Sequence, residues 1–419
     1  MSRLIANKST ALDRWLTGRL SSAIGDAPVR LALWDGFEYC PAGTVPAGTV
    51  IIRKRSALLK LLLEPELYFG DGYSAGDIEV EGDLVGMLDT VYRAVSRRPT
   101  CRWFPALLAR WSSWAQANSL RGSRRNIHHH YDLGTNFYQL WLDPQLLYTC
   151  AYFRNPCDTL EQAQIAKMDH VCRKLQLQPG ATVVEAGCGW GALALHMARD
   201  YGAIVKAFNI SRDQINYARW RAKQEGLSSR VEFIEDDYRN IGGRHEAFVS
   251  VGMLEHVGRE NYRELGSVIH GCLADKGRGF VHFIGRNRPT AMSSWTTSRI
   301  FPGAFAPALR EALEVFEGWD FSVLDVENLR LHYARTLELW LERYERSREK
   351  VAGMFNPDFV RMWRLYLTAS IASFRSGSMQ LFQVTFARGQ DNTVPWTREH
   401  IYRWQDDSEQ EGRWIRAMS

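Results

Sequence analysis

Three glycines stand at alternate positions in the segment VVEAGCGWG, residues 183–191, directly after a pair of β-branched residues. Glycine has no Cβ atom, so Gly187, Gly189 and Gly191 permit a sharp turn and a close approach of the backbone to a ligand. The apolar segment that follows predicts a helix, whose first N–H groups and positive dipole end attract anions. We therefore expect an anionic or carboxylate group to bind at this turn, beside the acidic Glu185.

Two classes of ligand compete for such a turn. A dinucleotide is typical of the spacing GxGxxG with an acid after the second strand, whereas this chain has GxGxG and Asn209 there. An acid two residues before GxGxG resembles the turn that binds S-adenosylmethionine (SAM) in Rossmann-like methyltransferases. A turn that needs glycine only for packing is less favoured, because four strand–helix units follow in order.

The elements that position the turn alternate between strand and helix. Such alternation predicts a parallel sheet with right-handed crossovers, in which ligands bind at the carboxyl ends of the strands. Strand patterns cover residues 181–187, 203–211, 230–237, 246–254 and 277–285, and helix patterns cover residues 191–202, 213–226 and 262–273. The sequence thus predicts an α/β fold for this part of the chain.

The first part of the chain has a different pattern. Residues 1–115 predict a smaller α+β domain, with residues 116–419 as the catalytic domain and a basic, Trp-rich linker over about 97–126. Helices are expected over 12–20, 56–73 and 83–98, and strands over 29–34 and 47–55. The length of 419 residues agrees with two domains.

Further stretches narrow the functional class. They are HYDLGTNFYQLWLDPQLLYTCAYF (130–153), SVGMLEHVG (250–258), FVHFIG (280–285), IFPGAF (300–305) and HYARTLELW (332–340). Together they resemble the cyclopropane-fatty-acyl-phospholipid synthase family and its mycolic-acid methyltransferase relatives, over about residues 126–390. The segment YFGDGYSAGDIEVEGDL (68–84) also resembles the extra N-terminal domain of the bacterial phospholipid enzymes.

This resemblance implies a SAM-dependent transferase that acts on unsaturated phospholipids. The π electrons of a cis alkene in an acyl chain attack the SAM methyl group, and a base then removes a proton from the new carbon so that a cyclopropane ring closes. In the family that base is thought to be a bound bicarbonate ion. The resemblance assigns the ion site to Cys150 (mainly its backbone), Glu255, His282, Ile284 (its backbone N–H) and Tyr333.

Taken alone, these residue types have ordinary interpretations. A single histidine such as His282 more often closes a strand, Tyr333 would pack at an interface, and Cys150 would behave as a small buried hydrophobe. The adjacent Glu255 and His256 lack the spacing of a metal site, so no metal is expected. Only the family resemblance favours catalytic roles.

The resemblance also assigns the SAM site. Its residues are Tyr148, Thr149, Glu185, Gly187, Gly189, Asn209, Ile210, Gln214, Asp237 and Tyr238, with Tyr131 as a lid or lipid-side residue. The family usually has Asp, Thr and Ser where this chain has Glu185, Asn209 and Thr149. Phe283 replaces a smaller residue and is expected to reshape the acyl pocket, which leaves the product open.

Other functions remain in competition. The same cation chemistry with a differently placed base would yield methyl- or methylene-branched acyl chains. A methyltransferase for RNA or another small molecule, and a non-catalytic lipid-binding protein, are further alternatives. The mild net charge of +5 and the absence of a basic-aromatic array argue against RNA as the substrate, and no nucleic-acid partner is expected.

Localisation follows from composition. Seven cysteines without a CxxC pair predict reduced thiols in the cytoplasm, and no signal peptide or membrane span is expected. Contact with the inner face of the membrane would use the N-terminal helix and basic residues, namely Arg53, Lys54, Arg55, Arg121, Arg124 and Arg125. The segment 355–389 is expected both to pack in the core and to line an acyl channel. The family resemblance suggests a homodimer through the N-terminal domain.

Overall fold

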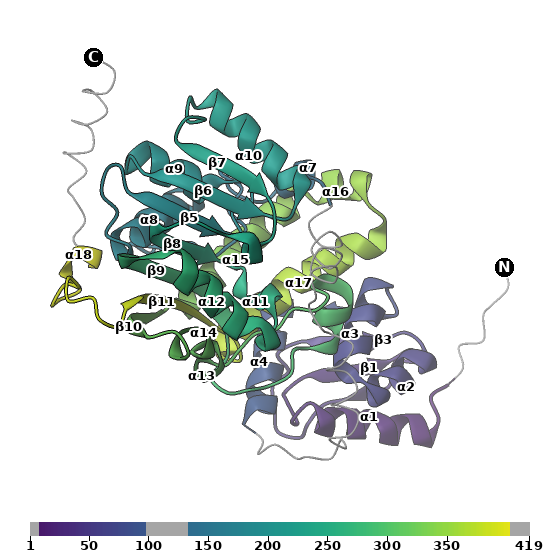
Figure 1. The fold of residues 1–419 in the computed structure, drawn as a ribbon. Helices are drawn as coiled ribbons and strands as arrows, with labels where there is room; N and C mark the ends of the chain where they lie inside the picture. The colour runs from purple at the N-terminus through teal and green to yellow at the C-terminus, as the bar shows by residue number, and fades with distance from the viewer. Residues whose placement is uncertain (1–7, 98–132, 403–419) are drawn as a thin grey trace.

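Two β-sheets organise the protein. The structure is a computed structural model that describes residues 8–97 and 133–402. One sheet has four strands and lies in the N-terminal region, and the other has seven strands (Figure 1). The predicted domain boundary near residue 115 lies outside the described residues. Within the described ranges no helix is long and apolar enough to cross a membrane.

The four-stranded sheet has the order β2-β1-β3-β4, in which only β1 and β3 are parallel. Its elements are α1 (Ala11–Ala23), β1 (Arg30–Leu33), β2 (Glu38–Tyr39), β3 (Thr49–Ile52), α2 (Arg55–Leu63), α3 (Pro65–Ser74), β4 (Ile78–Glu81) and α4 (Leu84–Ser96). The single helix expected over 56–73 is divided into α2 and α3. The reason is Pro65, which lacks an N–H donor and keeps the preceding Glu64 out of the helical conformation.

The seven-stranded sheet has the order β10-β11-β9-β8-β5-β6-β7. The strands are β5 (Thr182–Ala186), β6 (Ile204–Asn209), β7 (Val231–Glu235), β8 (His245–Val251), β9 (Leu273–Gly285), β10 (Phe321–Asn328) and β11 (Gln380–Arg388). The run from β7 to β9 is parallel, and β11 is antiparallel to both β9 and β10. The predicted Rossmann-like α/β fold is therefore confirmed. The sequence patterns do not predict β10, and β11 lies where the last strands were expected.

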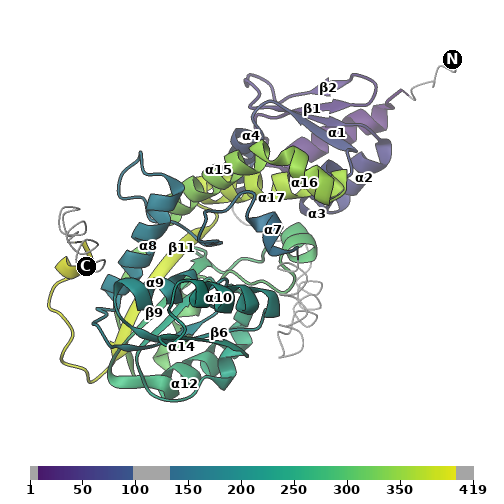
Figure 2. The same ribbon diagram turned by 90° about the horizontal axis from the view of Figure 1, so that it is seen from above.

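Helices cover both faces of this sheet (Figure 2). Alternate residues of each strand point to opposite faces, so Val183 packs in one apolar cluster and Val184 in another. The first cluster is formed with α8 (Leu160–Lys174), α9 (Ala192–Asp200) and α10 (Arg212–Gln224). The second is formed with α12 (Tyr262–Cys272), α13 (Leu309–Ala312) and α14 (Glu314–Glu317).

A third layer of helices lies between the two sheets (Figures 1 and 2). It consists of α15 (Arg330–Arg346), α16 (Arg348–Met354) and α17 (Pro357–Ser376), and α17 packs on α3 and α4. Arg361 of α17 donates to the carbonyl oxygens of Tyr73 and Ile78 at 2.6 and 3.1 Å. One apolar cluster runs through both regions. The predicted packing role of residues 355–389 is thus seen, and the acyl channel stays a prediction.

Candidate active site

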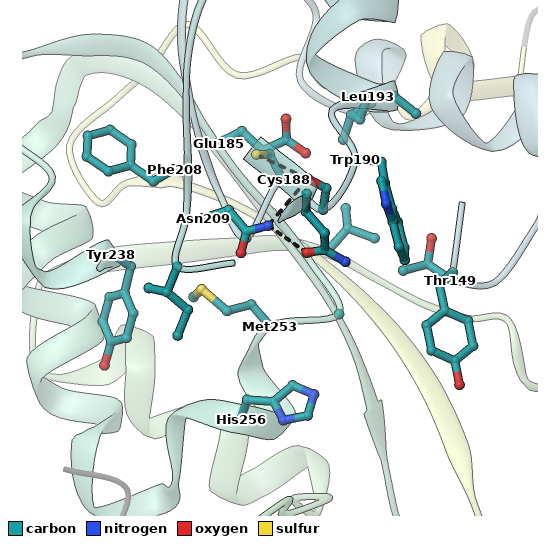
Figure 3. A pocket seen from close by; sticks show the side chains of 18 of the residues that line it. Thr149, Glu185, Cys188, Trp190, Leu193, Phe208, Asn209, Tyr238, Met253 and His256 are labelled. Atoms are coloured by element: carbon teal, nitrogen blue, oxygen red, sulfur yellow. Dashed lines mark hydrogen bonds between the residues drawn. The ribbon is translucent and has the colours of Figure 1, made fainter. Parts of the chain in front are cut away.

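A cavity lies at the carboxyl ends of the parallel strands (Figure 3). The direction of strand progression reverses at β5. From β5 the chain passes through α9 to β6, whereas β8 lies on the other side of β5 and leads to α12 on the opposite face. Connections that diverge in this way leave a crevice in which α/β proteins bind ligands. Here the crevice is a cavity of about 150 Å³.

All ten residues assigned to the cofactor from the sequence line this one cavity. They are Tyr148, Thr149, Glu185, Gly187, Gly189, Asn209, Ile210, Gln214, Asp237 and Tyr238. They come from the segment before α8, from β5 and the turn after it, from the end of β6 and the first turn of α10, and from the segment that follows β7. The parallel sheet brings these segments together because its strands all end at the same edge.

The glycine turn has the sharp backbone that its sequence predicts. Gly187, Gly189 and Gly191 have φ values of 83°, 54° and 83°, a region that side chains with a Cβ atom rarely adopt. A Cβ atom on Gly191 would lie only 2.6 Å from the Phe233 ring. On Gly189 it would meet nothing within 4 Å, so conformation alone favours glycine there. The turn thus brings α9 close to β7 and exposes backbone to the cavity.

Glu185 provides a buried acid in the cavity wall. It is 3 % exposed, and its Oε2 has no hydrogen-bond partner among the described residues. Burial raises the pKa of Glu185 to about 8, although the nearby Lys167 and the Ala194 N–H favour the charged form. A buried oxygen without a partner is costly, so this position suits a ligand with a positively charged donor.

The predicted ribose and adenine residues lie at the next two strand ends. Asn209 Nδ2 donates to Gln214 Oε1 at 2.7 Å and to the Gly189 carbonyl at 3.3 Å (Figure 3). Asp237 accepts the backbone N–H of Arg239 at 3.0 Å and contacts its guanidinium. This bond starts the short helix η1 (Tyr238–Asn240) and fixes the carboxylate beside the cavity.

The segment before α8 closes the opposite wall. Tyr148 and Tyr366 of α17 share a hydrogen bond of 2.7 Å between their hydroxyl groups. Thr149 Oγ1 accepts a hydrogen bond of 2.9 Å from Lys167 Nζ. This side of the cavity is therefore held by contacts to α8, which follows it directly in the sequence, and to α17, which is distant in the sequence.

A one-turn helix separates the cavity from a second group of residues. Helix α11 (Leu254–Val257) follows β8, and Met253, His256 and Val257 line the cavity. Glu255 does not line it. Its Oε1 accepts the backbone N–H of Ile284 at 2.6 Å, and its Oε2 has no partner among the described residues. Burial raises the pKa of Glu255 to about 7.

None of the five residues assigned to the bicarbonate site lines the cavity. Two of them, Glu255 and Ile284, contact each other as described. Two others meet at the Leu329 carbonyl, which accepts the Tyr333 N–H at 3.1 Å and lies 3.9 Å from Cys150 Sγ. Burial raises the pKa of the Cys150 thiol, so it stays protonated.

The fifth residue, His282, is buried in β9 and paired with β11. Its Nδ1 lies 3.2 Å from Nε2 of Gln383, the residue opposite it in the strand register. Burial, with the charges of Lys167 and Lys174 in the same direction, lowers the pKa of His282 to about 3. The imidazole is therefore neutral at physiological pH. Its carbonyl accepts the Gly252 N–H at 2.8 Å, which joins this strand to the cavity edge.

The structure places Phe283 on the side of the sheet opposite to His282 and Ile284, and its expected effect on the acyl pocket stays a prediction. Successive residues of a strand face opposite sides of the sheet, so Phe283 points away from His282 and Ile284. It is fully buried on the α12 side, with its ring centroid 5.7 Å from that of Phe382. Its size therefore affects core packing beneath α12.

Three of the basic residues proposed for lipid headgroups already have acidic partners. Arg53 pairs with Glu79, Lys54 with Asp77 at 2.5 Å and Arg55 with Asp13 at 2.8 Å. These pairs leave little unbalanced positive charge for a lipid surface. The other proposed residues, Arg121, Arg124 and Arg125, and the lid candidate Tyr131, lie outside the described residues.

Comparison with known proteins identifies the family. The profile of the family described as mycolic acid cyclopropane synthetase matches residues 118–384, and a domain of unknown function matches residues 18–97. The chain belongs to the mycolic acid cyclopropane synthetase family. It is therefore a SAM-dependent transferase of the class that makes cyclopropane or methyl-branched fatty acids.

Relatives of this family match most of the chain or about three fifths of it. A probable fatty acid methyltransferase of Pseudomonas putida is 35 % identical, over 90 % of this chain and 96 % of that protein. The cyclopropane-fatty-acyl-phospholipid synthase of Escherichia coli is 38 % identical, over 63 % of this chain and 68 % of that protein. A crystal structure of the mycolic acid cyclopropane synthase CmaA1 with SAH and CTAB aligns with 63 % of this chain and 97 % of its own, at 30 % sequence identity and a TM-score of 0.60. SAM as the cofactor agrees with the unpartnered acid and the amide pair of the cavity.

Several cavity residues were missed from the sequence. They are Lys167, Trp190, Met253 and His256, among others. Lys167 stands in a helix pattern at i, i+3 and i+7 with His170 and Lys174, which ordinarily indicates a solvated face. All three are buried here. His170 and Lys174 pair with Asp325 and Glu327 on β10, whereas Lys167 Nζ donates to Thr149 Oγ1. Since the sequence patterns do not predict β10, they gave no signal for the burial of His170 and Lys174.

Proposed function

We propose that this enzyme adds one carbon from SAM to a cis double bond of an unsaturated phospholipid acyl chain and closes a cyclopropane ring. The observation that carries the proposal is the adjacency of two sites. The residue pairs Thr149–Cys150 and Met253–Glu255 each contribute one member to the cofactor cavity and one to the buried polar group. A methyl donor in the cavity and a base in the polar group would therefore stand close to the same alkene.

The chain's residues support this chemistry by position and charge. When bound, SAM supplies an electrophilic methyl group. Ring closure requires loss of a proton from the added carbon, so a base must stand beside it where water is excluded. Glu255, His282 and Tyr333 are all buried, and His282 is neutral. Buried polar groups of this kind can hold a base without quenching the carbocation.

Bicarbonate as that base fits the polar group in part. With a pKa of about 7, Glu255 is protonated in a substantial fraction of molecules, and Oε2 could then donate to an anion. The Ile284 N–H, which the resemblance assigned to the ion, instead donates to Glu255 Oε1. A bound ion would therefore share the Ile284 N–H with Glu255. The other walls of the ion site would be formed by Cys150, His282 and Tyr333.

A methyl- or methylene-branched product is the second candidate. It is favoured by the relative that aligns over 90 % of this chain, which bears the name probable fatty acid methyltransferase. Both products arise from one carbocation. Ring closure removes a proton from the added carbon directly, whereas a methylene branch forms when a hydride first shifts between the two chain carbons and the added carbon then loses a proton; a saturated methyl branch would need a hydride donor in addition. The position of the base relative to the added carbon would decide between them.

Product analysis tests both candidates. The enzyme would be incubated with SAM and vesicles of a cis-monounsaturated phospholipid, and the released acyl chains examined by mass spectrometry and proton NMR. A gain of one CH₂ with high-field ring protons is expected. The same mass with vinylidene protons would favour the branched product, and no gain in mass would refute both.

Contact with the membrane surface is a further part of the proposal. On α1, Leu12 and Trp15 are 55 % and 60 % exposed, which suits shallow insertion between lipid headgroups. Trp15→Glu should reduce co-sedimentation with anionic vesicles by more than half. Trp220→Glu on α10, at 55 % exposure, is the matched control, and equal losses in both would contradict the role of α1. A homodimer stays a prediction that sedimentation velocity would check.

A further inference from the structure

We propose that Lys167 binds the carboxylate of the methionine end of SAM, in the same cavity as Glu185, which binds the ammonium group. The inference rests on SAM as the cofactor within the proposed function, and it does not depend on the acyl product. Lys167 lies in the middle of α8, outside the glycine turn and the other segments from which the SAM site was expected.

The charge of the cavity wall is the first argument. Among the described residues that line the cavity, Lys167 is the only lysine or arginine. The histidine among these lining residues, His256, is neutral because burial lowers its pKa to about 4. The methionine end of SAM carries one positive and one negative group. Glu185 matches the first, and only Lys167 supplies a side-chain charge for the second.

The geometry of the lysine is the second argument. Lys167 is 1 % exposed. Within the described structure, its ammonium group makes one hydrogen bond, from Nζ to Thr149 Oγ1 at 2.9 Å. A lysine ammonium has three N–H donors, and a buried charge with unused donors is costly. The charge of the nearby Asp143 favours the charged lysine, but its carboxylate oxygens accept the N–H groups of Gln145 and Leu147 at 2.8 and 3.1 Å and make no hydrogen bond to Nζ within the described structure.

The mutual electrostatics of the pair are the third argument. Burial lowers the pKa of Lys167 to about 8 and raises that of Glu185 to about 8, and each charge favours the other. A bound ligand that places a negative group beside Lys167 and a positive group beside Glu185 would therefore favour the charged form of both side chains. A zwitterion supplies both at once, so it would compensate Lys167 and Glu185 together. Thr149, which holds Nζ at the cavity wall, would act as a positioning residue.

A competing site for the carboxylate is the N-terminus of α9, whose first N–H groups follow Gly191. The two sites predict different results when the lysine is removed. If α9 alone holds the carboxylate, loss of Lys167 leaves SAM affinity unchanged. If Lys167 holds it, the loss appears only with ligands that carry the carboxylate.

Calorimetric titration of the full-length protein with SAM and with decarboxylated SAM separates these cases. Wild-type protein should bind SAM at least 30-fold more tightly than the decarboxylated ligand. Lys167→Met should weaken SAM at least 30-fold and decarboxylated SAM less than threefold. Glu185→Gln should weaken both ligands by a similar factor, because both retain the ammonium group. Lys206→Met, at an exposed position on β6, is the matched control and should change neither affinity.

Two results would overturn the inference. One is equal affinity of the wild-type protein for the two ligands, a measurement that requires no variant to fold. The other is a Lys167→Met variant that weakens both ligands equally or neither. Neither result would bear on the acyl product, because no lipid is present. Conversely, absence of a modified acyl chain in the product assay would leave this binding comparison intact.

Discussion

The cofactor cavity and the buried polar group beside it differ in how their side chains are satisfied. In the cavity, Glu185 Oε2 has no hydrogen-bond partner among the described residues, and the Lys167 ammonium uses one of its three N–H donors within them. A ligand would therefore complete the hydrogen bonding of both side chains. In the polar group, His282 is paired with Gln383, and Glu255 is bonded to Ile284. The cavity leaves a buried acid and a buried lysine to be matched by a ligand, whereas the polar group pairs its histidine within the chain but leaves Oε2 of Glu255 without a partner among the described residues.

The difference shows how a one-turn helix can serve two sites. The N-cap residue Met253 and the α11 residues His256 and Val257, which stand at i, i+3 and i+4, line the cavity. Glu255 lies on the other side and reaches β9. Because neighbouring helical residues are separated by about 100°, one short motif can build two adjacent sites. Substitutions should therefore affect one region without disturbing the other.

The largest effect is expected for Glu255→Gln. The amide oxygen can still accept the Ile284 N–H, so the local structure should be kept, while the carboxyl group is lost. Turnover of a cis-monounsaturated phospholipid should fall by about 10³-fold, typical of a lost acid–base or electrostatic group. SAH affinity, measured by calorimetry, should change less than threefold. A parallel loss of affinity would show that the two regions are not separate. Glu317→Gln on α14 is the surface control.

A smaller effect is expected for Glu185→Gln, and in the other region. Loss of the charged acceptor should weaken SAM binding by about 10- to 100-fold, while turnover at saturating SAM should fall far less. The wild-type carboxyl has a pKa of about 8, so it is increasingly protonated as the pH falls below 8. Wild-type affinity should therefore decrease from pH 8 to pH 6, by up to about tenfold per unit. In Glu185→Gln this dependence should be absent, and its persistence would assign the titration to another group.

The smallest effect is expected for Tyr366→Phe, which removes the hydroxyl bond between α17 and the cavity residue Tyr148. The free energy of unfolding in urea should fall by about 1 kcal/mol. SAH affinity and turnover should each change less than threefold. Tyr68→Phe in the N-terminal region is the control. A loss of turnover near that of Glu255→Gln would place this tyrosine pair in the catalytic group and move the boundary between the regions.

Sequence patterns predicted the parallel part of the molecule well and its antiparallel edge poorly. The strands β5 to β9 are buried β-branched runs between helical patterns, and each was expected near its observed place. Strand β10 is exposed along much of its length and has no such pattern. Missing it also concealed the burial of His170 and Lys174, because their acidic partners lie on that strand.

The sequence by itself determined the α/β fold and the glycine turn, because these follow from local patterns, and the family resemblance of its motifs assigned ten of the residues that line the cofactor cavity. The tertiary structure alone decided which charges are buried and which are paired. It buried Lys167 in the cavity wall, turned Phe283 away from His282 and matched Arg53, Lys54 and Arg55 with acids. The physical reason is that burial and ion pairing depend on segments distant along the chain, which only the packed sheet and its helices bring into contact.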